Sequence, residues 1–124
     1  MRMNQEHKLY HYKALGRRVV DGDTIDVTLD LGFGVYLKER VRFFGINAPE
    51  TRTRDKDEKK RGLAAKAFVR DALKLNKNCC VIRTRFNSKG KFGRILGVVY
   101  VEGENLNSAL VDKGLAKRYY GGKR

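Results

Sequence analysis

The chain has 124 residues, with 28 lysines and arginines against 14 aspartates and glutamates, so its formal net charge is +14 at neutral pH. This length fits one domain with a single core, and the charge predicts a polyanionic partner. No stretch approaches the roughly 20 apolar residues of a membrane-spanning helix, which makes nucleic acid a better candidate than an anionic membrane. We expect a monomer that binds DNA or RNA and no membrane.

The N-terminus and the cysteines indicate the expected cellular location and the absence of disulfides. The polar N-terminus lacks the apolar region of a secretory signal, which predicts a cytoplasmic protein, or a secreted one if a signal was removed. Cys79 and Cys80 are adjacent, and a disulfide between neighbours is strained, so no disulfide scaffold is expected. We divide the chain into an N-terminal segment (1–18) that leads into the first strand, a domain (19–120) and a short basic tail (121–124).

The domain is expected to begin with two strands joined by the turn DGDT at residues 21–24. After this turn, apolar residues alternate strictly with polar ones up to residue 30, as in a strand with one buried face. Asp23 shares the parity of the apolar residues and should face inward, whereas Asp26 should face solvent.

A third strand is predicted over residues 35–46, with one apolar face and one basic face. Arg42 lies where the basic face becomes apolar, and the strand runs into Pro49, the only proline of the chain. The next residues, 51–61, are almost all charged, which predicts a mobile surface loop.

The remaining elements complete a mainly β fold. Apolar residues recur at spacings of three and four over residues 63–75, which predicts an amphipathic helix. Strands are expected over 79–86 and 94–101, separated by a turn at 87–91, and a short helix over 105–113 that ends before Gly114. Five strands and these helices predict an α+β, mainly β fold: a five-stranded Greek-key barrel of the OB type with two to three helices.

Several residues at the predicted strand ends suit the hydrolysis of a phosphodiester, which needs an activated water, cationic donors and a positioned carboxylate. An inward aspartate such as Asp23 can hold a hard cation through oxygen. Arg42 and Arg94 can clamp a phosphate with parallel N–H donors, and Glu50 can activate water. Taken singly, each has a structural alternative: DGDT is a good tight turn, and Arg42 suits an edge strand.

Four segments, in order, carry a family resemblance: VVDGDT, RFFGINAPE, KFGR and NSALVDKGLAKRYY. Together they resemble the staphylococcal nuclease (thermonuclease) family over residues 19–120. The resemblance implies an OB-fold endonuclease that cleaves DNA and RNA with calcium and little sequence specificity. It also implies that Asp23 is a metal ligand, that Ala48 offers its backbone carbonyl to the metal, and that Arg42, Glu50 and Arg94 are catalytic.

Asn47 departs from the family pattern, which usually has a second metal-binding aspartate at this position. An amide keeps one ligand oxygen but removes a negative charge, so weaker calcium binding is expected. The resemblance also places Lys91, Phe92 and Tyr120 in the substrate-binding region, where aromatic rings stack on bases. Each also has a structural alternative: Lys91 as a solvated lysine in a turn, Phe92 as a packing residue of the hairpin, and Tyr120 as a cap of the C-terminal tail.

Two functions are therefore compatible with the sequence. The first is a calcium-dependent nuclease acting on DNA or RNA, preferably single-stranded. The alternative is a catalytically weak or inactive OB-fold module that binds single-stranded nucleic acid, because the residue at position 47 has weakened the metal site. The retention of Glu50 favours the nuclease, since a module that only binds has no chemical need for a general base.

Overall fold

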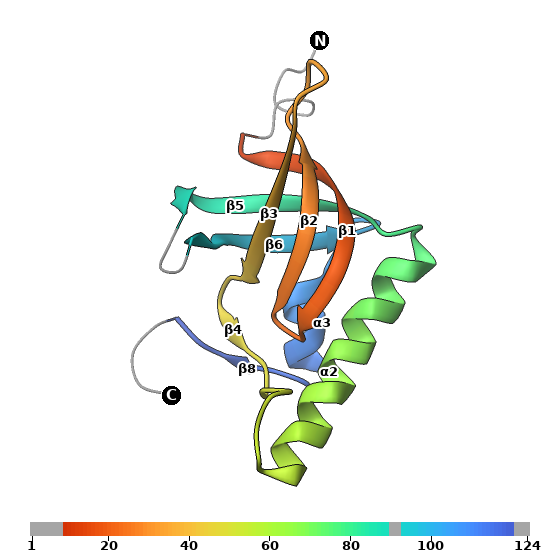
Figure 1. The fold of residues 1–124 in the computed structure, drawn as a ribbon, viewed down its shortest axis with the longest axis vertical. Helices are drawn as coiled ribbons and strands as arrows, with labels where there is room; N and C mark the ends of the chain where they lie inside the picture. The colour runs from red at the N-terminus through yellow and green to blue at the C-terminus, as the bar shows by residue number, and fades with distance from the viewer. Residues whose placement is uncertain (1–8, 90–92, 121–124) are drawn as a thin grey trace.

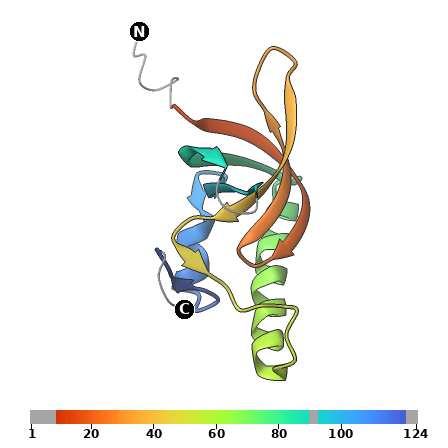
Figure 2. The ribbon, with the colours of Figure 1, turned by 60° about the vertical axis from the view of Figure 1, so that its left-hand side comes forward.

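The computed structural model describes residues 9–89 and 93–120, which form a closed barrel flanked by helices (Figures 1 and 2). The barrel strands are β1 (His11–Asp21), β2 (Thr24–Asp30), β3 (Tyr36–Phe43), β5 (Cys79–Lys89) and β6 (Ile95–Val101). Neighbouring strands run antiparallel in the order β3-β2-β1-β5-β6, and a parallel pairing of β3 with β6 closes the ring. The predicted five-stranded barrel and the α+β class are thus confirmed.

Shorter elements attach to this barrel. β4 (Ile46–Asn47) pairs with β8 (Lys117–Arg118), and β7 (Glu104–Asn105) pairs with the end of β6. The helix α2 (Lys56–Leu75) packs against β1, and α3 (Leu106–Asp112) packs against β6. Within residues 9–89 and 93–120, no helix is long and apolar enough to cross a membrane.

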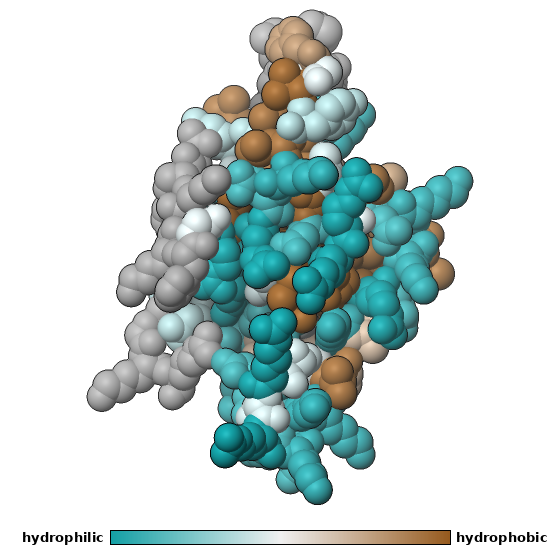
Figure 3. All heavy atoms as spheres, viewed as in Figure 1, coloured by the Kyte–Doolittle hydropathy of each residue, from teal (hydrophilic) through white to brown (hydrophobic). Residues whose placement is uncertain are grey.

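The core follows from the alternation seen in the sequence. Ile25, Val27 and Leu29 of β2 are all at most 2% exposed, and Val69 of α2 is fully buried against the barrel. Asp26, on the other face of β2, lies outside and pairs with Arg40 of β3. Most of the face in Figure 3 is hydrophilic, and hydrophobic residues gather at the projecting hairpin between β2 and β3.

The charged segment 51–61 was predicted to be a loop throughout, and this is wrong for its second half. The helix α2 begins at Lys56, because the Asp55 carboxylate accepts hydrogen bonds from the backbone N–H groups of Asp57 (3.0 Å) and Glu58 (3.2 Å). Acidic residues in the first turn also suit the positive end of the helix dipole. Apolar periodicity missed these turns because they are exposed, but an aspartate followed three residues later by a glutamate is a capping signal.

Three other boundaries differ from the sequence prediction. The strand expected over 35–46 is interrupted at a turn where Gly45 has φ +80°, a conformation that favours glycine. β1 begins already at His11, because its first residues pair with β5. β5 extends to Lys89, into the segment predicted as a turn.

A buried amide fixes the turn that follows β3. Asn107 of α3 is 4% exposed, and its Nδ2 donates to the carbonyls of Phe44 (2.8 Å) and Gly97 (3.2 Å). Its Oδ1 accepts from the backbone N–H of Val99 (3.0 Å). One side chain therefore joins α3 to β6 and to the turn directly after Arg42.

The ion pair between Asp26 and Arg40 makes stability depend on pH. The hydrogen bonds from the Arg40 guanidinium (2.7 and 3.1 Å) lower the pKa of the Asp26 carboxyl. A lowered pKa stabilises the fold above the ordinary carboxyl range, and this contribution is lost as the pH falls through the folded-state pKa. Asp26→Asn should therefore lower the free energy of unfolding at pH 7 by about 0.2–1 kcal/mol, as measured by urea denaturation.

The difference between Asp26→Asn and the parent should shrink as the pH drops below about 4. Asp71→Asn, on the exposed face of α2, serves as the control and should change stability less. If the free energy of unfolding of Asp26→Asn stays below that of the parent by the same amount down to strongly acidic pH, the stabilising role of the ion pair is contradicted.

Candidate metal and phosphate site

Asp23 is a buried carboxylate that joins the β1–β2 turn to the segment after β4. Its side chain is near the barrel interior, and the residue is 7% exposed, as its parity predicted. Oδ2 accepts a hydrogen bond from the backbone N–H of Ala48 (2.8 Å), and Oδ1 accepts from the Thr24 hydroxyl (3.0 Å). The DGDT motif, through Asp23, is thus in direct contact with the RFFGINAPE motif, through Ala48.

Arg42 is 8% exposed, and its guanidinium closes the turn that follows its own strand. Nη1 donates to the carbonyls of Phe43 and Ile46, both at 2.9 Å. Nη2 donates to Oδ1 of Asn47 (3.2 Å) and lies 3.5 Å from Oδ2 of Asp23. The side-chain oxygens of Asp23 and Asn47 therefore converge on one nitrogen atom.

This donor set can be tested for its fit to a hard cation. Asp23 supplies a carboxylate and Asn47 a neutral amide oxygen, both of the oxygen type that calcium prefers. Their shared contact with Arg42 Nη2 shows that the two oxygens approach a common point where a positive charge is stabilised. Within residues 9–89 and 93–120, no three histidine, cysteine, aspartate or glutamate residues gather into a metal cluster. Asp23 and Asn47 thus supply oxygen donors of the type that a hard cation prefers, and the cation that lies between them in this structure is the Arg42 guanidinium.

Glu50 is exposed, but its backbone is held from two sides. Its N–H donates to Oε2 of Glu58 in the first turns of α2 (3.3 Å). The hydroxyl of the next residue, Thr51, donates to Oδ1 of Asp21 (2.5 Å). A Cβ atom added at Gly62 would lie 2.5 Å from the carbonyl oxygen of Glu50, so α2 packs directly on this backbone. A solvent-facing carboxylate is thereby placed on a fixed support.

Sequence reasoning missed Glu58 and Gly62, both of which support Glu50. Each belongs to the part of α2 that was assigned to a loop, or directly follows it. The capping signal of Asp55 and Glu58 marks the helix start, and it would have placed Gly62 inside a helix, where glycine usually needs a packing reason.

The second arginine approaches the same end of the barrel along a neighbouring strand. Arg94 is half-buried and directly precedes β6. In the parallel pairing of β3 with β6, Ile95 lies beside Val41 and Leu96 beside Arg42. Arg94 therefore enters the sheet next to the strand that carries Arg42. Lys91 and Phe92, which precede it in the KFGR motif, lie outside the described residues.

Tyr120 lies on the outside of the turn that Arg42 closes. It is 68% exposed, and its ring meets the Phe44 ring edge-on with 5.8 Å between centroids. On the same Phe44 ring, the guanidinium carbon of Arg85 stands 4.6 Å from the centroid. An exposed aromatic surface with a cation thus borders the cluster of Asp23 and Arg42.

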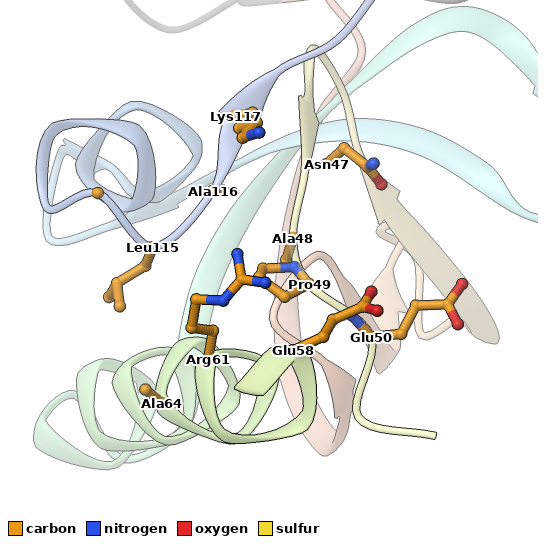
Figure 4. A pocket seen from close by; sticks show the side chains of 11 residues that line it. Asn47, Ala48, Pro49, Glu50, Glu58, Arg61, Ala64, Leu115, Ala116 and Lys117 are labelled. Carbon is orange, nitrogen blue, oxygen red and sulfur yellow. The ribbon is translucent and has the colours of Figure 1, made fainter. Parts of the chain in front are cut away.

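A pocket of about 370 Å³ opens on the other side of the segment 47–50 (Figure 4). Its walls come from this segment, from the first half of α2 and from the chain between α3 and β8. The lining residues are Asn47, Ala48, Pro49, Glu50, Glu58, Arg61, Ala64, Gly114, Leu115, Ala116 and Lys117. Residues 47–50 therefore lie between the Arg42 cluster and this pocket.

Loss of the Glu58 carboxylate should loosen the backbone at Glu50. Glu58→Ala removes the acceptor for the Glu50 N–H, so we expect faster hydrogen exchange of that amide and a loss of about 0.5–1.5 kcal/mol in the free energy of unfolding. Glu58→Gln keeps an oxygen acceptor and should retain most of the protection. Lys59→Ala, an exposed change in the same turn, is the control. Equal exchange rates in all three variants would contradict this role for Glu58.

Comparison with known proteins places the sequence in a family. The family model described as staphylococcal nuclease homologue matches residues 40–124. Similar proteins include the SPbeta prophage-derived endonuclease YokF of Bacillus subtilis (strain 168), 34% identical over 109 residues, which are 83% of this chain and 33% of that protein. Endonuclease YncB of the same organism is 32% identical over 109 residues, 83% of this chain and 46% of that protein.

Thermonuclease of Staphylococcus intermedius is 33% identical over 105 residues, which are 83% of this chain and 57% of that protein. The chain thus spans less than two thirds of the length of each of these relatives. The match to the family model covers most of the chain, including the segment with Arg42, Asn47, Glu50 and Arg94. The chain therefore belongs to the staphylococcal nuclease homologue family.

Proposed function

We propose that the chain is a calcium-dependent endonuclease that hydrolyses phosphodiester bonds of DNA or RNA with little sequence specificity. The observation that carries the proposal is the convergence of the Asp23 and Asn47 oxygens with the Arg42 guanidinium, directly before the supported Glu50. Relatives named endonuclease and thermonuclease support the reaction class. The net charge of +14 supports a polyanionic substrate.

The residues divide the work of hydrolysis between them. Asp23, Asn47 and the carbonyl of Ala48 hold the calcium ion, which when bound offsets negative charge on the phosphate. Glu50 accepts a proton from the water that attacks phosphorus, as the bond from phosphorus to the leaving oxygen breaks. Arg42 and Arg94 donate N–H groups to the phosphate oxygens, where negative charge grows in the transition state.

Single strands are the proposed form of the substrate. The exposed ring of Tyr120 beside Phe44 offers a surface on which an unpaired base can stack. Lys91 and Phe92 are proposed to contribute to the same binding region on the strength of the KFGR motif alone.

The alternative is an OB-fold module that binds single-stranded nucleic acid and cleaves it weakly or not at all. One observation favours it: the Arg42 guanidinium already contacts four protein oxygens, on Phe43, Ile46, Asn47 and Asp23. Under this alternative, binding is sensitive to salt, and no calcium concentration yields product.

Removal of single catalytic groups should distinguish the two functions. Glu50→Gln, Arg42→Ala and Arg94→Ala should each reduce calcium-dependent cleavage of denatured DNA or RNA by at least about 10²-fold, the scale of a general base or an electrostatic donor. Because Arg42 is buried, Arg42→Lys is added as a variant that keeps the charge but loses the two parallel donors. Circular dichroism checks that each variant is folded.

Arg70→Ala, an exposed change on α2, serves as the matched control and should leave turnover within about twofold of the parent. Undiminished turnover in all three catalytic variants would refute the nuclease assignment of these residues. A parent protein that binds nucleic acid but forms no product would favour the binding module.

Restoration of the second carboxylate should lower the calcium requirement. Asn47→Asp adds a negative charge to the metal ligands, so the calcium concentration for half-maximal cleavage should fall by about tenfold, or 1.4 kcal/mol. Asn105→Asp is the control, because Asn105 caps α3 and aspartate caps a helix equally well. An unchanged calcium requirement in Asn47→Asp would contradict the placement of the metal at residue 47.

A further inference from the structure

The pocket beyond the segment 47–50 has an apolar floor and two cations facing each other across it. Ala48, Ala64 and Leu115 contribute to the floor, while Arg61 comes from α2 and Lys117 from β8. In Figure 4, Arg61 reaches from the helix toward Pro49, and Lys117 stands on the strand opposite. The volume of about 370 Å³ falls within the range of small-ligand pockets, about 300–1,000 Å³, and has room for one nucleotide unit.

The two cations are available to a ligand. Within the described part of the chain, neither Arg61 nor Lys117 forms an ion pair, whereas Arg40 and Arg42 do. Glu58, the carboxylate on the same helix wall, already accepts from the Glu50 N–H (3.3 Å) and from the Thr53 hydroxyl (3.5 Å). Two cations that form no ion pair and lie beside the proposed catalytic segment are a suitable setting for a phosphate group.

The pocket adjoins the proposed reaction site, because residues 47–50 form a wall of the pocket and also contact Arg42 and Asp23. Asn47 contacts Arg42 with its side-chain oxygen and lines the pocket as well. Glu50 stands at the same boundary (Figure 4). A strand whose scissile phosphate lies at Arg42 and Glu50 can therefore continue past Glu50 into the pocket in one direction.

We propose that this pocket binds the nucleotide next to the scissile phosphodiester. Arg61 and Lys117 donate to the phosphate of that nucleotide, and its sugar or base rests on the apolar floor. The inference rests on the proposed nuclease function and adds a substrate subsite to it.

The charge of the pocket favours a phosphate within a strand over one at its end. Glu50 and Glu58 add two carboxylates to the lining of the same pocket. A terminal phosphate monoester carries close to two negative charges, as a phosphoserine does, whereas an internal phosphodiester carries one. The diester is therefore repelled less by the carboxylates, which agrees with internal cleavage of a chain.

The test uses the double variant Arg61→Ala/Lys117→Ala on two substrates. A single-stranded oligonucleotide has phosphates on both sides of each bond, whereas a dinucleoside monophosphate has only the phosphate that is cleaved. For the oligonucleotide we expect KM to rise about tenfold with kcat within about twofold of the parent. For the dinucleoside monophosphate, kcat/KM should be unchanged.

Lys60→Ala is the matched control, because Lys60 is the exposed neighbour of Arg61 in α2 and does not line the pocket. It should leave KM for both substrates unchanged. A loss of activity that is equal for the two substrates, or an oligonucleotide KM like that of the parent, would overturn the subsite.

Binding in the presence of EDTA separates this inference from the proposed function. The dependence of oligonucleotide affinity on salt, followed by fluorescence anisotropy, should weaken in the double variant by about 0.7 in log–log slope, since one neutralised phosphate of a single strand contributes about 0.7. If the parent cleaves neither substrate, the nuclease proposal fails, and the salt dependence of binding alone decides whether the subsite exists. A double variant with the same slope as the parent would refute the subsite.

Discussion

A single buried guanidinium holds the site together. A buried charge is costly unless it is paired and hydrogen-bonded, and Arg42 satisfies this requirement with two backbone carbonyls, the Asn47 amide oxygen and the Asp23 carboxylate. The same contacts fix the turn after β3 and the direction in which Asn47 points. Without this cation, the Asp23 carboxylate would lose its nearest positive charge, so the geometry of the site and the stability of this barrel end are linked.

The segment 47–50 is supported from the barrel on one side and from a helix on the other. Asp23 accepts the hydrogen bond of the Ala48 N–H from the barrel side. On the helix side, Glu58 accepts the Glu50 N–H, and the lack of a side chain at Gly62 lets α2 approach the backbone. An exposed side chain on an irregular segment is usually mobile; here the backbone of Glu50 is attached to two rigid elements, which suits its proposed role as a general base.

The sequence predicted the barrel because strand alternation has a strict period of two. It predicted the burial of Asp23 but not that of the neighbouring Thr24, which is only 5% exposed, so the period does not continue through the DGDT turn. It failed at the start of α2, because apolar periodicity cannot detect helical turns that bury almost nothing. The family motifs indicated Arg42, Asn47 and Glu50 individually. They did not predict that Arg42 folds back onto Asn47, since this contact depends on the turn at Gly45 and on the amide of Asn107 that fixes it.

The amide of Asn47 affects both the calcium ion of the proposed reaction and the Arg42 guanidinium. An aspartate there would bind calcium more strongly, but it would also place a second carboxylate at the Nη2 atom of Arg42, 3.2 Å from the present amide oxygen. The present hydrogen bond joins a cation to a neutral amide, whereas a carboxylate would add the attraction between two opposite charges, so Arg42 would be held more tightly to the protein. Arg42 has to exchange part of these contacts for a phosphate oxygen in the proposed reaction. In the proposed reaction, asparagine would therefore lower the affinity for the metal and, by the same change, lower the cost of releasing Arg42 to the substrate.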